Sequence, residues 1–320
     1  MGVNLRDIVV QKEISFKDLS GKTIAVDALN TIYQFLSSIR QADGTPLMNS
    51  QGEVTSHLSG LLYRTSNLIR MDIKPVYVFD GKPPDLKFKT LQVRGERKRE
   101  AQEEWVKAKE EGRLDDALKF AKRTSKLTDK MLADSKTLLT MMGVPHVQAP
   151  SEGEAQCARM VREGNAWAVG SQDFDCLLFG APKLVRGLTL SGKMELGIIE
   201  LDAVLSDLGV TKEQLIDLAI LVGTDFNEGV YGIGPKKALK AVKEGRASEF
   251  DVDFAGVREV FLNPETSGEY DVSWGKVDAE GMVELLYRRN GFSEERVRKA
   301  ASELEAAYRD NTQQSLSKWF

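Results

Sequence analysis

The 320-residue chain has only two cysteines and two histidines. Cys157 and Cys176 form neither a disulfide framework nor a zinc motif, and His57 and His146 add no ligand cluster. No apolar run approaches the ~18 residues of a transmembrane helix. The first residues, Met1–Arg6, lack the apolar core of a signal peptide. We therefore expect an intracellular, cytoplasmic protein with no membrane partner.

The chain also lacks an excess of positive charge. Its formal net charge is −4 and its pI about 5.6. At first sight this argues against a nucleic-acid partner, because phosphate binding needs cations. The two signs are nevertheless segregated. Residues 82–130 hold 15 Lys and Arg against 10 Asp and Glu. The acidic excess therefore lies in the rest of the chain, where part of it can form a functional cluster.

Four short apolar segments lead into acidic residues: Thr23–Val26 into Asp27, Pro75–Phe79 into Asp80, Ala166–Gly170 into Asp173 and Asp175, and Leu218–Val222 into Asp225. The first three have the composition of buried strands, whereas the fourth ends an amphipathic, helical pattern. Helical patterns at 54–71 and 131–142 separate the strands, which predicts an α/β fold with a mainly parallel central sheet flanked by helices. Acids at the carboxyl ends of such strands converge at one edge.

Seven acids are candidates for one shared site: Asp27, Asp80, Glu152, Glu154, Asp173, Asp175 and Asp225. Two unit charges ~4 Å apart repel by ~4 kcal/mol at an effective dielectric of ~20, so such a cluster needs protons or cations. Oxygen ligands favour hard ions, so we expect two Mg²⁺ ions, for which Mn²⁺ can substitute. A pair of such ions suits phosphodiester hydrolysis.

Two of the acidic segments also have local interpretations. If Asp173 and Asp175 continue a strand, their i, i+2 spacing points both carboxylates the same way, with Phe174 on the opposite face. Ser151 with Glu154 three residues later matches a capping box, which would explain this glutamate by a helix start alone. The capping and metal-site interpretations are compatible, since a helix N-terminus can also face the site.

Successive segments resemble the motifs of the flap endonuclease family, in order: Val26–Ala28, Tyr77–Pro84, Ala149–Ala155, Ser171–Asp175, Gly223–Phe226, Gly232–Ala238 and Gly291–Arg296. The resemblance covers essentially the whole chain, and the short C-terminal end resembles the archaeal type. It implies a PIN-like 5′ nuclease fold with a helical arch and a helix-turn-helix. It also implies an Mg²⁺-dependent endonuclease, with 5′–3′ exonuclease activity, that cuts near the base of 5′ flaps in DNA replication and repair.

The resemblance assigns roles to residues of the site and of the arch. It implies that the seven acids are metal ligands, with Asp173 also catalytic, and that Lys87 and Arg94 steer the scissile phosphate. These two cations, seven residues apart, would share one helical face; the alternative is two solvated side chains. Residues 82 to about 130 become the arch over a single-stranded flap, whose contacts include Lys122 and Arg123.

Other residues are implied to contact the DNA. Gly232 and Gly234 predict a tight turn into a helix whose N-terminus binds a backbone phosphate. Tyr33 would stack on a base near the cut, or else be a half-buried core aromatic. The remaining implied contacts are Lys236, Lys237, Lys240, Gly2, Arg40, Thr55 and Arg64.

The last eight residues resemble a peptide that binds the sliding clamp (PCNA). Gln313, Leu316, Trp319 and Phe320 fit the pattern Q-x-x-(aliphatic)-x-x-(aromatic)-(aromatic), and the apolar side chains would anchor in a hydrophobic pocket. The alternative is a tail packed on its own domain. We divide the chain into one nuclease domain, 1–308, with parts 1–98, 82–130 and 116–258, and a tail, 309–320.

Other functions remain open. A non-catalytic, junction-binding clamp adaptor would not need all seven acids, and a small-molecule phosphohydrolase would have no use for the basic turn or the clamp peptide. A 5′ exonuclease or a bubble-cutting repair nuclease is the nearer alternative. The short spacing from Lys82 to Glu152 disfavours the repair nuclease, whose arch carries a long insertion. The expected partners of this monomer are the clamp and DNA with a 5′ flap or a nicked or gapped junction.

Overall fold

The computed structural model describes residues 2–189 and 195–317, with side chains up to residue 311. Seven strands in these residues form one sheet in the order β1-β7-β6-β5-β2-β3-β4. Their bounds are β1 Lys12–Glu13, β2 Thr23–Asp27, β3 Lys74–Phe79, β4 His146–Gln148, β5 Ala168–Gly170, β6 Lys183–Arg186 and β7 Gly197–Glu200. Strands β6-β5-β2-β3-β4 are parallel, and β7 pairs antiparallel with both β1 and β6. The predicted mainly parallel sheet is confirmed.

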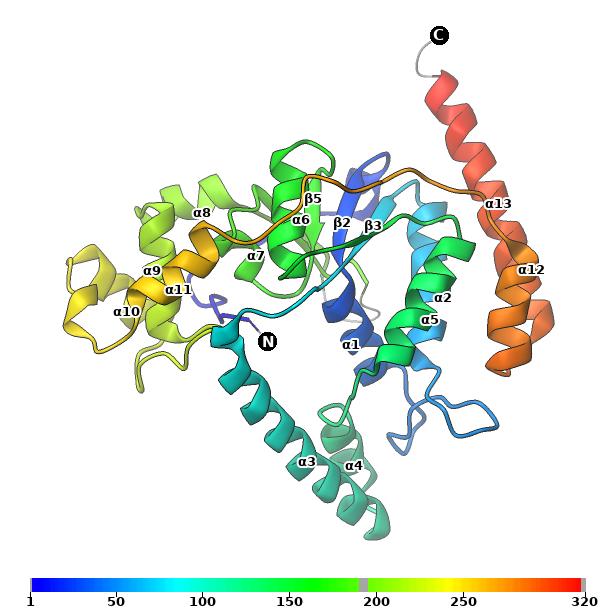
Figure 1. The fold of residues 1–320 in the computed structure, drawn as a ribbon, viewed down its shortest axis with the longest axis horizontal. Coiled ribbons are helices and arrows are strands. Elements are labelled where there is room, and N and C mark those ends of the chain that lie inside the picture. The colour runs from blue at the N-terminus through cyan, green and yellow to red at the C-terminus, as the bar shows by residue number, and fades with distance from the viewer. Residues whose placement is uncertain (1, 190–194, 318–320) are drawn as a thin grey trace.

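Helices lie on both faces of this sheet (Figure 1). Their bounds are α1 Ala28–Ser38, α2 Ser56–Arg70, α3 Phe88–Glu110, α4 Leu114–Ala121, α5 Asp129–Met141, α6 Gly153–Arg162, α7 Asp175–Leu178, α8 Leu201–Leu208, α9 Lys212–Val222, α10 Pro235–Lys243, α11 Phe254–Leu262, α12 Ala279–Met282 and α13 Glu294–Ser317. A π-helical segment, Val283–Arg289, follows α12, and short 3₁₀ turns lie at Phe16–Leu19, Asp85–Lys87 and Ala247–Glu249. In the described part of the chain, no helix is long and apolar enough to span a membrane.

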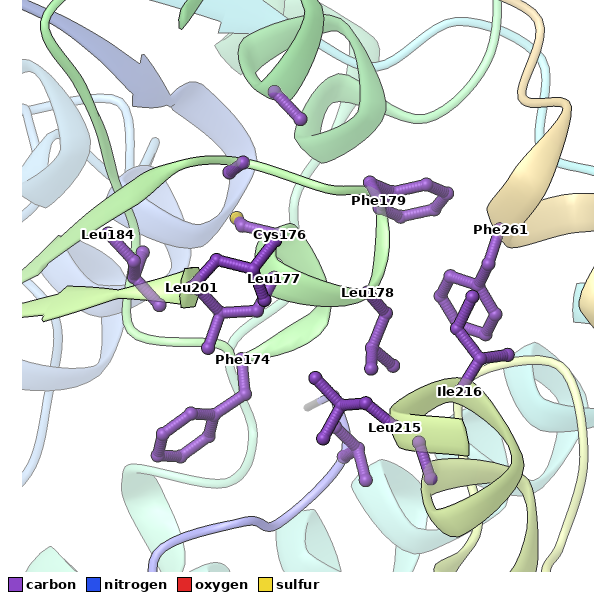
Figure 2. Packing of buried hydrophobic residues seen from close by; sticks show 14 of the residues in the cluster. Phe174, Cys176, Leu177, Leu178, Phe179, Leu184, Leu201, Leu215, Ile216 and Phe261 are labelled. Carbon is purple, nitrogen blue, oxygen red and sulfur yellow. The ribbon is translucent and has the colours of Figure 1, made fainter. Parts of the chain in front are cut away.

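The sheet divides the buried apolar residues into two clusters. Strand alternation places Val76 and Val78 of β3 in the first cluster and Tyr77 and Phe79 in the second. The first cluster continues into α6, α7, α9 and α11, and the second into α1, α2, α5 and α13. Figure 2 shows part of the first cluster around α7. Because both faces are covered, the central strands are apolar over most of their length, as expected of a parallel sheet.

Helices α3 and α4 project from the body as a hairpin (Figure 1). On α3 only Ala101 and Ala108 are buried, so most of this long helix is solvated. The Asp85–Lys87 turn joins it to the end of β3. This hairpin coincides with the basic segment, residues 82–130, that was predicted to form the arch.

Candidate active site

The seven candidate acids lie at the carboxyl ends of the parallel strands or on segments beside them. Asp27 ends β2, Asp80 follows β3, Glu152 and Glu154 begin α6, Asp173 and Asp175 follow β5, and Asp225 follows α9. Electrostatic repulsion links them across elements: Asp27 with Asp80 and Asp173, and Asp175 with Glu154 and Asp225. The topology therefore brings together acids that are far apart in sequence.

Asn30 connects two of these acids. Asp27 caps α1 by accepting a hydrogen bond from the backbone N–H of Asn30 at 3.0 Å. The side-chain amide of Asn30 donates to Asp173 Oδ2 at 2.9 Å, and Ser171 Oγ donates to Asp27 Oδ2 at 3.3 Å. Sequence reasoning missed Asn30 and Ser171. The available signals were that Asn30 is the third residue after Asp27, the N-cap of α1, and that Ser171 lies two residues before Asp173.

The start of α6 is held against β3. Gly153 N–H donates to Asp80 Oδ1 at 2.8 Å, and a Cβ on this glycine would lie 2.3 Å from the same oxygen. Residue 153 must therefore be glycine for Asp80 to keep its position. Glu152, the N-cap residue, makes no side-chain capping bond but faces the site.

The capping box between Ser151 and Glu154 does not form. The helix begins at Gly153, one residue later than that motif requires. Ser151 Oγ instead donates to the backbone oxygen of Lys82 at 3.0 Å, and Glu154 accepts a 3.6 Å contact from the thiol of Cys176. The pairing of this loop with the segment after β3 thus displaces the local motif.

The strand geometry predicted for Asp173 and Asp175 is also wrong. Strand β5 ends at Gly170, and Asp175 is the first residue of α7. Phe174 is buried in the first apolar cluster, which turns the chain away from the extended path. Asp175 Oδ1 accepts a hydrogen bond from Val3 N–H at 2.7 Å.

The predicted site residue Gly2 lies directly against this carboxylate. A Cβ added to Gly2 would be 2.5 Å from the Asp175 carboxyl atoms. The N-terminal segment therefore forms one wall of the acidic site, and residue 2 has no room for a side chain.

Burial makes the acids costly to ionise. It raises the pKa of Asp27 to about 8, with further repulsion from Asp80, and the pKa of Asp175 to about 7, with repulsion from Asp225 and Asp173. Burial likewise raises the pKa of Glu154 well above its ordinary value. Ionisation of the cluster at neutral pH therefore calls for nearby cations.

Two cations from the base of the arch reach these acids. Lys87 Nζ lies 2.5 Å from Glu152 Oε2 and 3.7 Å from Asp225 Oδ2, and Arg94 also pairs with Asp225. Burial opposes the charge of Lys87, but Glu152 and Asp80 raise its pKa above the ordinary value, so it remains an ammonium ion. Lys87 lies in the 3₁₀ turn before α3 and Arg94 on α3 itself, so the two cations reach the site from successive elements and not from the one helical face that the spacing had predicted.

The donor set fits hard divalent ions. Among the described residues, no three carboxylate, imidazole or thiol groups already converge on one point as a formed metal site. Instead, several oxygens bind Lys87, Arg94 and backbone N–H groups. The carboxylates supply oxygen ligands and are buried or half-buried, which is the chemistry that suits Mg²⁺ or Mn²⁺.

Further contacts join the arch to the body. Tyr33 is half-buried on α1, and Lys98 Nζ lies 4.6 Å from the centre of its ring. Lys89 of α3 forms a 3.0 Å ion pair with Glu228, in the loop after α9. Local sequence contains no signal for these pairs, because their members are far apart along the chain.

The other predicted DNA contacts lie in different settings. Arg40 donates to the backbone oxygens of Leu36 and Gly44 and to Ser125, so it fastens a loop to the end of the arch. Thr55 is buried, Arg64 is half-buried, and Lys122 and Arg123 are exposed after α4.

The basic turn has the predicted local form. Gly232 has a φ of 78°, Gly234 is the N-cap of α10, and Pro235 is its first residue. Lys236, Lys237 and Lys240 are exposed. Gln313 and Leu316 fall on the backbone of α13, but Trp319 and Phe320 lie outside the described residues.

Comparison with known proteins gives matches along most of the chain. The XPG N-terminal domain model matches residues 1–101, and the XPG I-region model matches residues 143–225. The chain is 51% identical to flap endonuclease 1 of Methanothermobacter thermautotrophicus, over all of both chains. It is 49% identical to that of Pyrococcus horikoshii, covering all of this chain and 98% of the other.

Solved structures give the same result. Flap endonuclease-1 from Methanococcus jannaschii superposes with a TM-score of 0.82 at 43% identity, covering 97% of this chain and 99% of that one. The catalytic core of Rad2 in complex with DNA substrate has a TM-score of 0.71 at 24% identity, covering 94% and 97%, and supports the fold alone. Full-length identity at this level, with matching fold and motifs, leads to one conclusion: the chain belongs to the flap endonuclease 1 family.

Proposed function

We propose that this protein is a structure-specific 5′ flap endonuclease. It would hydrolyse one phosphodiester near the base of a 5′ flap with two divalent metal ions, and would also act as a 5′–3′ exonuclease. One observation carries the proposal: acids from separate elements gather beneath an arch whose Lys87 and Arg94 reach them. The names of the relatives, flap endonuclease 1, support the same reaction.

The proposed metal ligands are the seven acids Asp27, Asp80, Glu152, Glu154, Asp173, Asp175 and Asp225. Bound Mg²⁺, or Mn²⁺ in its place, would supply an activated water and stabilise charge on the phosphate. The chain's own contribution is to hold these oxygens ready. Asn30 fixes Asp173, Ser171 contacts Asp27, and Gly153 N–H fixes Asp80.

Lys87 and Arg94 would bind the scissile phosphate. Their present partners are Glu152 and Asp225. A phosphate that enters the site offers oxygens of the same charge, so the two side chains can exchange a carboxylate for the substrate. Lys supplies a point charge and Arg a two-pronged fork of N–H groups.

The arch and the basic turn would sort the DNA by structure. Helices α3 and α4 project from the body as a hairpin (Figure 1) whose base contacts the acids through Lys87 and Arg94, and its lysines and arginines suit a single-stranded flap. Lys122 and Arg123 are proposed flap contacts. The turn at Gly232 and Gly234, with the α10 lysines, would hold the duplex by its backbone, without reading sequence.

The finer assignments are also part of the proposal. Gly2, Tyr33, Arg40, Thr55 and Arg64 are proposed DNA contacts. Residues 313–320 would bind the sliding clamp and bring this monomer to sites of DNA replication and repair inside the cell. Helix α13 continues from Glu294 through Ser317, so the proposed tail at 309–320 begins within a helix.

The test is Mg²⁺-dependent cleavage of three labelled DNAs: a double-flap junction, a plain duplex and a free single strand. We expect cutting at the flap base of the junction, little cutting of the other two, and complete loss with EDTA. Tight junction binding without cutting would replace this proposal with the clamp-adaptor function. Equal cutting of all three substrates would remove structure specificity.

A further inference from the structure

Tyr231 is an aromatic side chain that the rest of the protein leaves uncovered. Its relative exposure is 104%, the highest of any large hydrophobic residue in the described part of the chain, and Val10 follows at 77%. An aromatic ring contributes most when its faces are packed against another surface. A fully solvated ring on a folded segment therefore suggests a contact made with something else.

The ring is presented by a fixed turn. Ile233 N–H donates to Val230 O at 3.0 Å, and Val230 N–H donates to Leu221 O at 2.8 Å. Val230 and Ile233 pack against the first apolar cluster. Gly232 supplies the positive φ of 78° that the turn needs. The residues on both sides of Tyr231 are thus anchored while its own side chain points outward, so the backbone of the turn has little conformational freedom left to lose on binding.

The surroundings of the ring suit a polyanion with an accessible backbone. A Cβ added to Gly232 or Gly234 would have no other atom within 4 Å. A ligand can therefore approach the main chain closely at both residues. Lys237 Nζ donates to Gly232 O at 3.0 Å, which brings its charge to the turn, and Lys236 is exposed beside it.

The same loop lies beside the base of the arch. Glu228, three residues before Tyr231, forms a 3.0 Å ion pair with Lys89 near the start of α3. The loop that carries Tyr231 is therefore linked to the base of the arch.

We propose that Tyr231 is a further DNA-binding residue, which packs its ring against a deoxyribose of the duplex and donates its hydroxyl to the adjoining phosphate. This inference rests on the proposed function, because it assumes a duplex beside the basic turn. Every nucleotide carries the same sugar and phosphate, so the contact adds affinity without sequence preference. The ring is neutral, so it releases no counterion when it binds.

The experiment measures Kd by fluorescence anisotropy for a labelled duplex and a double-flap junction, in EDTA, at several salt concentrations. Tyr231→Ala is expected to weaken both Kd values about 5- to 20-fold, through loss of one aromatic contact and one hydrogen bond, while the slope of log Kd against log salt stays unchanged. Lys236→Ala should instead reduce that slope by about one. Tyr231→Phe should fall between wild type and Tyr231→Ala, because it keeps the ring and loses the hydroxyl.

Tyr287→Ala is the matched control. Tyr287 is 41% exposed in the π-helical segment after α12, which lies at the opposite end of the molecule from α10 (Figure 1). This variant should bind like wild type.

Two outcomes overturn the inference. One is wild-type affinity in Tyr231→Ala, and the other is an equal loss in Tyr287→Ala. Flap cleavage by the wild-type protein, assayed in parallel with Mg²⁺, separates the two proposals. Cleavage together with an unaffected Tyr231→Ala variant removes only this contact, whereas a wild type that neither cuts nor binds duplex removes the proposed function as well.

Discussion

Single residues in the site differ in how their position is secured. Asp173 is held by a neutral amide, that of Asn30, so its charge is not cancelled by a bound cation. Asp225, in contrast, contacts both Lys87 and Arg94. In the proposed function, the first carboxylate is available to a metal ion and the second must first exchange its partners.

Replacement of Asp173 should therefore stop the reaction without releasing the DNA. Asp173→Ala is expected to lower the cleavage rate by more than ~100-fold, while Kd for the flap junction in EDTA changes little. Asp202→Ala, at an exposed position on α8, is the control and should cleave normally. A variant at 173 that retained wild-type cleavage would exclude this acid from the metal site.

Gly153 gives a test at the same scale that depends on space rather than charge. A methyl group at this position would lie 2.3 Å from Asp80 Oδ1, so Gly153→Ala must displace that carboxylate. We expect cleavage to fall about 10- to 100-fold, although alanine is the better helix former. Gly95→Ala on α3, where a Cβ meets nothing within 4 Å, should cleave like wild type; a parallel loss in both variants would contradict the steric explanation.

At the scale of whole elements, the arch is fastened at several points along α3. Lys87 and Arg94 bind acids at its base, Lys98 covers Tyr33, and Lys109 pairs with Asp43 at 2.8 Å near its end. The body thus contacts the arch through cations along α3. A helix with so little buried surface depends on such contacts for its docking.

Lys98→Ala should loosen the middle of the arch. A cation over an aromatic ring that water can still reach contributes about 0.5–1 kcal/mol, so hydrogen exchange of the α3 amides should become roughly 2- to 5-fold faster. Lys107→Ala, another exposed lysine of α3, should leave exchange in this region unchanged. If the two variants exchange alike, the contact with Tyr33 does not help to hold the arch.

The C-terminal residues form a second element whose role can be separated from catalysis. Removal of residues 313–320 should leave cleavage by the isolated protein unchanged, because none of the seven candidate acids lies in this segment. Stimulation by the sliding clamp should be lost, since the anchoring side chains are gone. A matched Ser315→Ala variant, at a position that the motif does not specify, should keep full stimulation. Clamp stimulation that survives the deletion would refute the assignment of this peptide.

At the scale of the whole molecule, a buried histidine links stability to pH. His57 on α2 is only 2% exposed, and neither ring nitrogen has a hydrogen-bond partner in the described residues. Burial lowers its pKa from the model-compound value of 6.5 to about 4. Between these two values the unfolded chain binds the proton and the folded protein does not, so the free energy of unfolding falls as pH decreases.

This difference corresponds to about 3 kcal/mol between pH 7 and pH 4. His57→Asn should therefore show a smaller loss of stability over this range, measured by urea denaturation at pH 7, 5.5 and 4.5. His146→Asn, which changes a half-buried histidine of β4, provides the comparison. An unchanged pH dependence in His57→Asn would show that other groups govern acid stability.

The fold could be predicted from the sequence where short-range patterns and general topology suffice. Apolar strands ending in Asp27 and Asp80 predicted a parallel sheet with acids at one edge, and the sheet has this form. The shape of the segment after β5 could not be predicted in this way. Its path depends on burial of Phe174 beneath helices from elsewhere in the chain, and local spacing does not encode such packing.

The same distinction applies to the site. The acids were identifiable by type and position, whereas Asn30 between Asp27 and Asp173 required knowledge of how α1 faces the β5 loop. The exposure of Tyr231 is likewise a property of the folded surface, since an aromatic residue in a sequence is more often part of the core. Sequence therefore predicted the chemical groups better than their partners.

The two cysteines make the protein suitable for site-specific chemical labelling. Cys157 and Cys176 are both fully buried, and burial raises the pKa of each thiol well above its ordinary value, so neither should react with a maleimide in the folded state. A cysteine introduced at an exposed arch position such as Gln102 would then be the only reactive thiol. A fluorescent dye attached there would report movement of the arch in single molecules, with both native cysteines left in place.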